Sequence, residues 1–365
     1  MSKVSVIKEA CNKRFSEEIR SLREHRASGS KVIGYTCNAF PCSVAAGLGF
    51  WPVRVLCSAS ADAESYGEQL ARSDVCPLVK SLLGNISQNR GLHADIDIWV
   101  GLYTCDQMRR GMDIVSERLK KEVHPVQVPS TRTDDAAKYY ASQIKRFVKD
   151  AEAQHGVSFD SELAMKWQSK RELSAAVLAD AVKSCEISPL ELHAMFHLFF
   201  VARPEGLAEF FKGIISDSLK FKSKKRIVLT GSPLTLEDTV VLEALEEKGV
   251  SVIPLNCTGL NCIDGGLSVQ SEDLIGSFSI SAFSMHSCMR ARPNTSVYNR
   301  IAETLKSTGA DGLLVKCLKF CDHWYTERER LRKTFNLPVL VFDSDYSDGG
   351  HERLLSRIDA FLEIL

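Results

Sequence analysis

A short apolar run that ends abruptly in polar residues is the feature that most constrains the fold of this chain. Gly312–Leu318 reads G-L-L-V-K-C-L, and Lys319, Phe320, Cys321 and Asp322 follow at once. A run of this length is typical of a strand buried on both faces of a parallel sheet. Ligands of open α/β sheets bind just beyond the carboxyl ends of the strands. Cys321 is therefore predicted to lie at the edge of the sheet where ligands bind.

The same arrangement of a strand followed by a cysteine occurs twice in the first half of the chain. Lys31–Thr36 is followed by Cys37, and Ile96–Tyr103 is followed by Thr104 and Cys105. Parallel strands end at the same edge of a sheet. We therefore predict that these thiols converge.

Strand-like and helix-like patterns alternate along both ends of the chain, which is typical of βαβ units. Further strands are predicted at Pro52–Leu56, Val123–Val128, Ile227–Thr230, Val250–Leu255 and Pro338–Phe342. Helices are predicted after Cys76-Pro77 and at Ser5–Arg26, Met108–Glu122, Ala136–Ala153, Ser161–Cys185, Pro189–Val201, Gly206–Leu219, Glu237–Lys248, Ser271–Ala282, Thr295–Thr308 and His351–Leu365. Thr235 and Asp238 suggest a capped start for the helix that Gly249 ends.

These patterns predict an α/β protein with two parallel-sheet domains of Rossmann or flavodoxin type, joined by a helical segment. The predicted divisions are an N-terminal α/β domain at 1–135, a helical bridging segment at 136–222 and a C-terminal α/β domain at 223–365. The functional site is expected in the cleft between the two sheets.

Charge and hydropathy exclude several classes of function. The 46 basic residues balance the 46 acidic ones, so net charge offers no basis for binding nucleic acid or an anionic membrane. No apolar run approaches the roughly 20 residues that cross a bilayer. Met1–Arg14 has no apolar core of a signal peptide. A cytoplasmic location is expected.

The chain contains 12 cysteines, and their chemistry stays open on the residues alone. Disulfides do not fit a large chain without a secretion signal. Zinc usually needs close pairs such as C-x₂-C, and the sequence has none. Inert buried thiols, zinc and an iron–sulfur centre remain as alternatives. Placement at strand ends and in turns argues against inert thiols.

The motifs, taken in order, resemble the superfamily of 2-hydroxyacyl-CoA dehydratases and benzoyl-CoA reductases. The resemblance runs from about Ile33 to Leu365 and rests on seven short motifs in family order. They are Cys37-x₃-Pro41 with Gly49-Phe-Trp-Pro-Val-Arg54, Cys76-Pro-Leu-Val-Lys80, Thr104-Cys-Asp106, Asn256-Cys-Thr-Gly259, Lys319-Phe-Cys-Asp322, Asp343–Ser347 and Arg357–Glu363.

The resemblance implies an iron–sulfur cofactor held by thiolates. Cys76, Cys105 and Cys321 match the three ligands of the single [4Fe–4S] cluster in ordinary dehydratase subunits. Cys37, Cys257 and Cys288 look like the second ligand set of the double-cubane branch, in which a sulfide joins two cubanes as an [8Fe–9S]-type cluster. Cys42 and Cys317 lie near proposed ligands in sequence and are alternatives to them.

The resemblance also implies an activity and a partner. The chain is expected to be a reductase that takes low-potential electrons from a separate ATP-hydrolysing iron–sulfur activator and reduces a small substrate, since it has no phosphate-binding G-x-x-x-x-G-K-[ST] loop of its own. A homodimer is expected. His286, His323 and Asp106 are candidate proton donors, with a supporting hydrogen bond or helix cap as the alternative role. Arg109, Lys316 and Lys319 are candidates to offset cluster charge, with solvated surface as the alternative.

Three other functions remain open. The first is a single-[4Fe–4S] subunit of a 2-hydroxyacyl-CoA dehydratase. The second is a non-catalytic protein that transfers electrons or carries a cluster. The third is a two-domain α/β protein with ordinary thiols. Iron and sulfide content separates the double-cubane reductase, the dehydratase subunit and the protein with ordinary thiols, for which about eight, about four and no iron atoms per chain are expected. Turnover with the ATP-hydrolysing activator separates the reductase from a protein that only carries electrons or a cluster.

Overall fold

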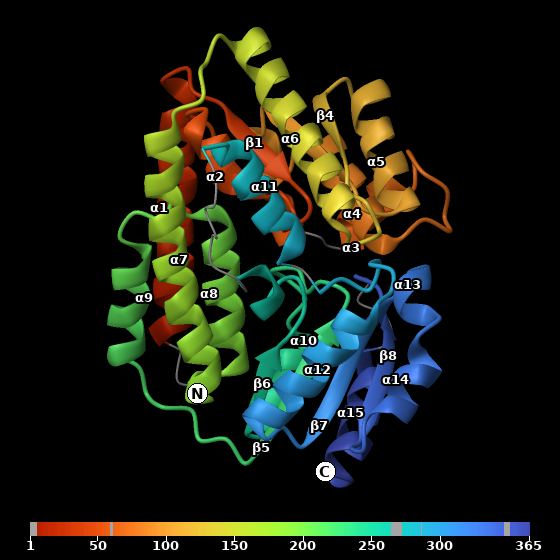
Figure 1. The fold of residues 1–365 in the computed structure, drawn as a ribbon. Helices are drawn as coiled ribbons and strands as arrows, with labels where there is room; N and C mark the ends of the chain where they lie inside the picture. The colour runs from red at the N-terminus through yellow and green to blue at the C-terminus, as the bar shows by residue number, and fades with distance from the viewer. Residues whose placement is uncertain (1–5, 59–60, 264–271, 286, 347–350) are drawn as a thin grey trace.

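The computed structural model describes residues 6–58, 61–263, 272–285, 287–346 and 351–365. It contains two four-stranded sheets in which every strand pairing is parallel (Figure 1). The strands are β1 Val32–Tyr35, β2 Trp51–Arg54, β3 Ile98–Tyr103, β4 Glu122–Gln127, β5 Lys225–Gly231, β6 Val250–Pro254, β7 Gly312–Leu318 and β8 Val339–Ser344. The predicted fold class of two parallel sheets is therefore confirmed.

Both sheets have the same topology, with strand orders β2-β1-β3-β4 and β6-β5-β7-β8. In each order the direction of winding reverses between the first and third strands in sequence, β1 and β3 in one sheet and β5 and β7 in the other. Such a reversal opens a crevice beyond the carboxyl ends of the two central strands. Each sheet thus presents one topological binding point.

Helices cover both sheets and form the middle of the chain (Figure 1). In the first half they are α1 Val6–Ala27, α2 Cys42–Gly47, α3 Ala61–Gly67, α4 Pro77–Ser87, α5 Asp106–Glu117, α6 Asp134–His155, α7 Ser161–Ser184, α8 Pro189–Val201 and α9 Leu207–Ser216. In the second half they are α10 Val240–Glu247, α11 Leu274–Ser284, α12 Thr295–Thr308, α13 Asp322–Tyr325, α14 Arg328–Thr334 and α15 His351–Glu363. Single 3₁₀ turns lie at Val55–Ser58, Gly91–Asp95 and Leu260–Cys262. No helix within the described ranges has the length and apolar character needed to cross a membrane.

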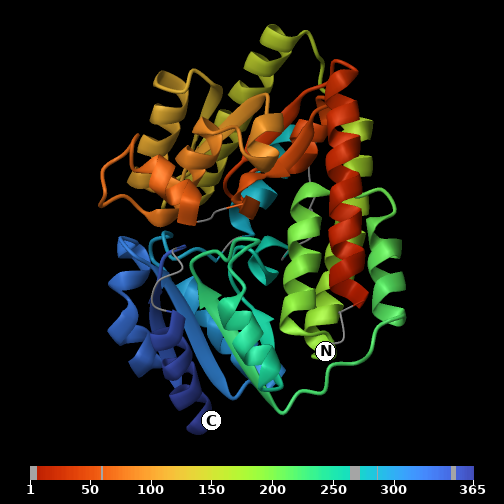
Figure 2. The same cartoon turned by 180° about the vertical axis from the view of Figure 1, so that it is seen from behind.

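The N-terminal helix joins the helical middle of the chain. Helix α1 packs on α8 and α9, and α7 packs on α2, α8 and α9; Figure 2 shows α1 running beside these helices. Trp51 in β2 donates a hydrogen bond of 2.9 Å to the carbonyl of Val201 at the end of α8. One apolar core contains side chains of both sheets and of these helices. The helices therefore hold the two sheets in a fixed relation.

Several helix boundaries differ from the prediction by three residues or more, and two of them have a clear physical cause. The helix expected at Met108–Glu122 ends at Glu117, because the chain turns at Lys120 with φ 53°, and Glu122 opens β4. The helix expected at Glu237–Lys248 begins at Val240. Asp238 cannot act as the expected cap, because its carboxylate is paired with the Lys316 ammonium.

Candidate functional site

The six cysteines predicted as ligands lie at the ends of strands or helices between the two sheets. Four follow strands: Cys37 after β1, Cys105 after β3, Cys257 after β6 and Cys321 after β7. Cys76 immediately precedes α4, and Cys288 follows α11. Cys37 and Cys105 follow β1 and β3, the two strands between which the winding of the first sheet reverses. Cys321 follows β7, one of the two corresponding strands of the second sheet. Cysteines therefore lie at the crevice of each sheet.

Cys76, Cys105 and Cys321 form the first group, which we call the helix-cap thiols. Each is the N-cap residue of a helix, α4, α5 and α13 respectively. The Cys105 Sγ accepts a hydrogen bond of 3.4 Å from the backbone N–H of Met108. Burial raises the pKa of Cys76 to about 12, and the neighbouring charges of Cys321 and Cys105 contribute to the rise. Three thiols from both halves of the chain thus share one neighbourhood.

Gln107 holds the loops of this group together across the two sheets. Its Oε1 accepts a hydrogen bond from the backbone N–H of Cys76. Its Nε2 donates a hydrogen bond of 3.1 Å to the carbonyl of Phe320, a residue with the left-handed φ of 61°. Gln107 therefore fixes the backbone at Cys76 and beside Cys321, the other two helix-cap thiols.

Cys37 and Cys288 form a second group around Arg290. The Arg290 guanidinium donates a hydrogen bond of 3.5 Å to the Cys288 Sγ. Burial opposes ionisation of Cys288, but Arg290 outweighs it and holds the pKa of Cys288 below its usual value. Burial raises the pKa of Cys37, an effect that Arg290 opposes and Cys288 reinforces. The charge on Cys105 also acts on Arg290, so this arginine connects the two groups.

Cys257 is held by two residues of the first half. Arg54 is 1% exposed and donates hydrogen bonds both to the Cys257 carbonyl and, at 3.4 Å, to its Sγ. Asn38 donates to the same carbonyl at 2.6 Å. Burial raises the pKa of Tyr346 far above its usual value, and Cys76, Cys257 and Cys321 add to this shift. Tyr346 therefore faces Cys257 and two helix-cap thiols together.

This donor set fits the iron–sulfur cofactor that the sequence predicts. Thiolate is the usual ligand of such clusters, in which each thiolate binds its own iron. Among the described residues, no three of these thiols lie within 4.8 Å of one another, as the ligands of one ion would. Burial raises the pKa of Cys37, Cys76 and Cys321, and a bound metal deprotonates a coordinating thiol. Arg54 and Arg290 would offset the remaining negative charge.

The other predicted site residues have different surroundings. His323 lies in α13, and burial lowers its pKa, helped by the charges of Arg290 and Arg292. Asp106, the exposed first residue of α5, acts on the same imidazole with the opposite sign, so the structure brings these two candidate proton donors together. His286 lies outside the described residues.

The alternative ligands and the candidate cations have surroundings of their own. Cys317 is fully buried in β7, and Cys42 lines a separate cavity. Lys316 is 1% exposed and paired with Asp238, so the expectation of a solvated lysine is wrong. Lys319 pairs with Asp345. Arg109 lies over the Tyr103 ring at 5.9 Å.

The cavity that contains Cys42 adjoins the second thiol group. Its volume is about 80 Å³, and its walls include Asn38, Ser43, Arg171 and Cys262. At roughly 30 Å³ per water molecule in the liquid, this volume admits about three waters. The cavity thus offers a small, partly polar space near the loops of Cys37 and Cys257.

Four contact residues were not singled out by the sequence: Arg54, Gln107, Arg290 and Tyr346. Arg54 and Tyr346 lie within motifs of the resemblance, and Gln107 and Arg290 lie within two residues of a proposed ligand. Their proximity to the motifs could therefore have marked them as candidates. Their contacts could not be predicted, because the contacts join segments far apart in sequence; Arg54 and Cys257 are 203 residues apart.

The fold and the thiols together define a class: two-sheet α/β proteins with cysteines gathered between the sheets. A family model described as "2-hydroxyglutaryl-CoA dehydratase, D-component" matches residues 37–365. The chain belongs to this family. It is also 23% identical to a protein of Escherichia coli (strain K12) named "Putative dehydratase subunit YjiM", over 94% of each chain. The predicted relation to the dehydratase superfamily is therefore confirmed.

Proposed function

We propose that this member of the dehydratase family is an iron–sulfur reductase that binds a double-cubane cluster and acts on a small substrate. The observation that carries the proposal is that two arginines donate hydrogen bonds to sulfur, Arg54 to Cys257 across the two sheets and Arg290 to Cys288. Arg290 also lies near enough to Cys37 and Cys105 for their charges to act on it. The helix-cap thiols would hold one cubane, and Cys37, Cys257 and Cys288 the other. When bound, such a cluster supplies one-electron chemistry at low potential.

The residues of the chain would prepare this site in three ways. Helix N-termini favour negative charge, so α4, α5 and α13 would stabilise their N-cap thiolates. Arg54 and Arg290 would stabilise thiolate sulfur by donating hydrogen bonds to Cys257 and Cys288. Burial between the sheets would exclude water, which strengthens these electrostatic interactions.

His323 would supply protons beside the helix-cap thiols. Burial and two arginines lower its pKa, so the imidazole is neutral at pH 7 and can accept a proton from solvent. The charges of Asp322 and Asp106 favour the protonated form of this imidazole. An imidazole whose pKa is lowered gives up its proton readily once it is protonated, which suits it to passing protons one at a time.

The size of the neighbouring cavity supports a small substrate. A space for about three waters accommodates a molecule of a few heavy atoms, whereas a CoA thioester would have to extend outside it. Arg171 lines this cavity and would favour an anionic or polar molecule. We place the substrate path here.

The second candidate is a single-[4Fe–4S] subunit of a 2-hydroxyacyl-CoA dehydratase. The description of the matching family and the name of the E. coli relative favour it. The helix-cap thiols alone would provide its three ligands. In this case Cys37, Cys257 and Cys288 would hold no iron.

Anaerobic iron and acid-labile sulfide analysis, with an EPR spectrum of the reduced protein, tests the proposal. We expect about eight iron atoms per chain from two four-iron units. About four would support the dehydratase subunit, and a colourless, iron-free protein would contradict both candidates. Turnover of small acceptors with the ATP-hydrolysing activator then separates a reductase from a protein that only carries electrons. The activator, the homodimer and the cytoplasmic location stay predictions from the resemblance.

A further inference from the structure

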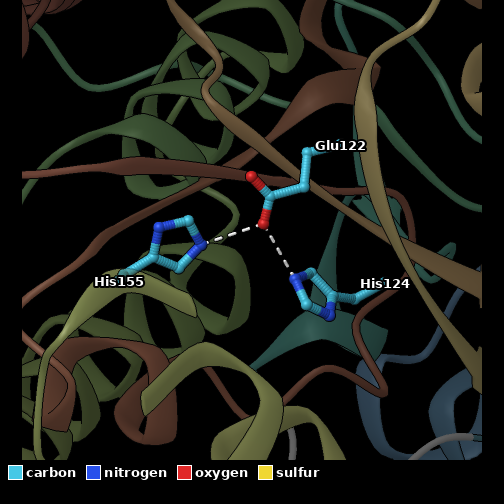
Figure 3. A group of neighbouring side chains, drawn as sticks. All are labelled: Glu122, His124 and His155. Atoms are coloured by element: carbon cyan, nitrogen blue, oxygen red, sulfur yellow. Dashed lines mark hydrogen bonds and ion pairs between the residues drawn. The ribbon is translucent and has the colours of Figure 1, made fainter. Parts of the chain in front are cut away.

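A second group of potential metal ligands lies in the first half of the chain, at Glu122, His124 and His155 (Figure 3). One carboxylate oxygen, Oε1 of Glu122, lies 3.0 Å from Nε2 of His124 and 2.9 Å from Nε2 of His155. The three ligand atoms all lie within 4.8 Å of one another. Figure 3 shows both imidazoles directed at the same carboxylate.

The local fold explains why these three side chains meet. Glu122 and His124 are two residues apart in β4, so they project from the same face of the strand. Helix α6 follows β4 and packs on it. His155 is the last residue of this helix, which brings its imidazole to the amino-terminal end of the strand. His124 is also fixed by packing against Phe147 of the same helix, with ring centres 5.4 Å apart.

The surroundings of the group favour a cation that enters from solvent. The side chains of His124 and His155 are 9% and 13% exposed, whereas that of Glu122 is 37% exposed. Two nearly buried imidazoles therefore lie behind one carboxylate that is partly exposed to solvent. The carboxyl end of a helix carries partial negative charge, and His155 lies at that end of α6.

We propose that Glu122, His124 and His155 form a binding site for a divalent transition metal, with Zn²⁺ as the best match. Two imidazoles and one carboxylate are a known protein ligand set for zinc, with water as the fourth ligand. Binding would replace the two hydrogen bonds to Glu122 by three bonds to the ion. The ion would tie β4 to the end of α6.

This site is separate from the thiol groups. Glu122 pairs with Ile98 at the start of β3, whereas Gln127 pairs with Tyr103 at its end, next to Cys105. Five residue steps of about 3.3 Å place the two ends of β4 about 16 Å apart along the strand. Metal at Glu122 would therefore act on the stability of this edge of the sheet and not on the thiols directly.

The test uses anaerobically purified protein equilibrated with Zn²⁺, followed by metal analysis and X-ray absorption at the zinc edge. Iron does not contribute at this edge, and a sulfur shell would reveal zinc bound to cysteine. We expect one zinc per chain with only nitrogen and oxygen neighbours, and a melting temperature raised by Zn²⁺. Loss of a ligand should weaken binding by about tenfold or more, since even changes to residues that only support a ligand cost that much.

Two variants and one control make the test specific. His155→Asn at the helix end and Glu122→Gln at the strand start should both abolish the thermal shift and weaken zinc binding. His351→Asn, in the first turn of α15, should bind zinc as the unchanged protein does. Circular dichroism without zinc checks that each variant is folded. Zinc with sulfur neighbours, equal binding by all proteins, or no binding at all would overturn the proposal and would show that two histidines share a carboxylate for structural reasons only.

Discussion

The Arg54 guanidinium donates hydrogen bonds to both the carbonyl oxygen and the sulfur of Cys257. Arg54 ends β2 in the first sheet, and Cys257 follows β6 in the second. Arg54 is almost fully buried, with its guanidinium also 4.8 Å from the centre of the Phe200 ring. One side chain thus positions a thiol across the two sheets and supplies positive charge to it.

Replacing Arg54 should make the bound cluster harder to reduce. A hydrogen bond from a cation stabilises sulfur most in the reduced, more negative state. Arg54→Met should therefore shift the midpoint potential to more negative values by on the order of 50–100 mV, the equivalent of one charge-assisted hydrogen bond. An EPR-monitored redox titration measures the shift. Arg54→Lys keeps the charge and should give a smaller change; an unaltered potential in an iron-loaded Arg54→Met protein would argue against the contact.

Loss of a proposed ligand should remove iron and activity together. Cys105→Ser and Cys321→Ser each leave one iron without its thiolate, so iron per chain should fall along with turnover. Cys185→Ser is the matched control, because Cys185 ends α7 beside Val182 and has no place in the thiol groups. Iron analysis and activity on the same preparations are the measurements. Equal iron in all three variants would refute the ligand assignment.

Gly231 should tolerate no side chain. It has φ of 108°, and a Cβ at this position would lie 2.0 Å from the carbonyl oxygen of Lys316. Gly231→Ala should lower the free energy of unfolding by about 2 kcal/mol or more, because strain and a clash add.

Gly213 provides the control for this substitution. It lies inside α9, and a Cβ there would meet nothing within 4 Å. Gly213→Ala should stabilise the protein by about 0.5–1 kcal/mol through helix propensity. Denaturant unfolding of both variants is the measurement, and equal effects would contradict the close approach at Gly231.

Acid should destabilise the fold through two buried histidines. Burial lowers the pKa of His93 and of His193 to about 4 each, whereas unfolded histidine titrates near 6.5. Between these values the unfolded chain binds more protons, so stability is fully present above pH 6.5 and falls as pH drops towards 4. The loss is up to about 3 kcal/mol per histidine.

Urea unfolding at several pH values between 7.5 and 4.5 measures this dependence. His193→Gln should show a shallower fall than the unchanged protein, since glutamine does not titrate. Comparing the two proteins cancels the acid effects that they share. Parallel curves would show that His193 does not carry the predicted linkage.

The sheets could be predicted from the sequence because most strands are apolar runs ended by polar residues, although β4 mixes apolar and polar residues. All eight predicted strands are present, with boundaries within two residues. The helix ends were less predictable. The sequence suggested Asp238 as part of a helix cap, but its carboxylate pairs with Lys316 of β7. A residue far away in the sequence therefore determines the role of Asp238.

The part of the candidate site that lies at strand ends could be predicted from the sequence. Cys37, Cys105, Cys257 and Cys321 follow strands, so topology alone places the first two at one edge of the first sheet and the last two at one edge of the second. The contacts of Arg54 and Arg290 depend on how two sheets face each other, which no local pattern encodes. The group of Glu122, His124 and His155 was likewise missed, because a strand and a helix end meet only after α6 folds back over β4.

An anomalous difference map at the iron edge, from crystals grown without oxygen, tests the central claim most directly. The account predicts iron between the two sheets, bonded to the helix-cap thiols and to Cys37, Cys257 and Cys288. Iron bonded to the helix-cap thiols alone would replace the reductase proposal with the dehydratase subunit. An iron-free map, or iron bound away from these cysteines, would contradict the account.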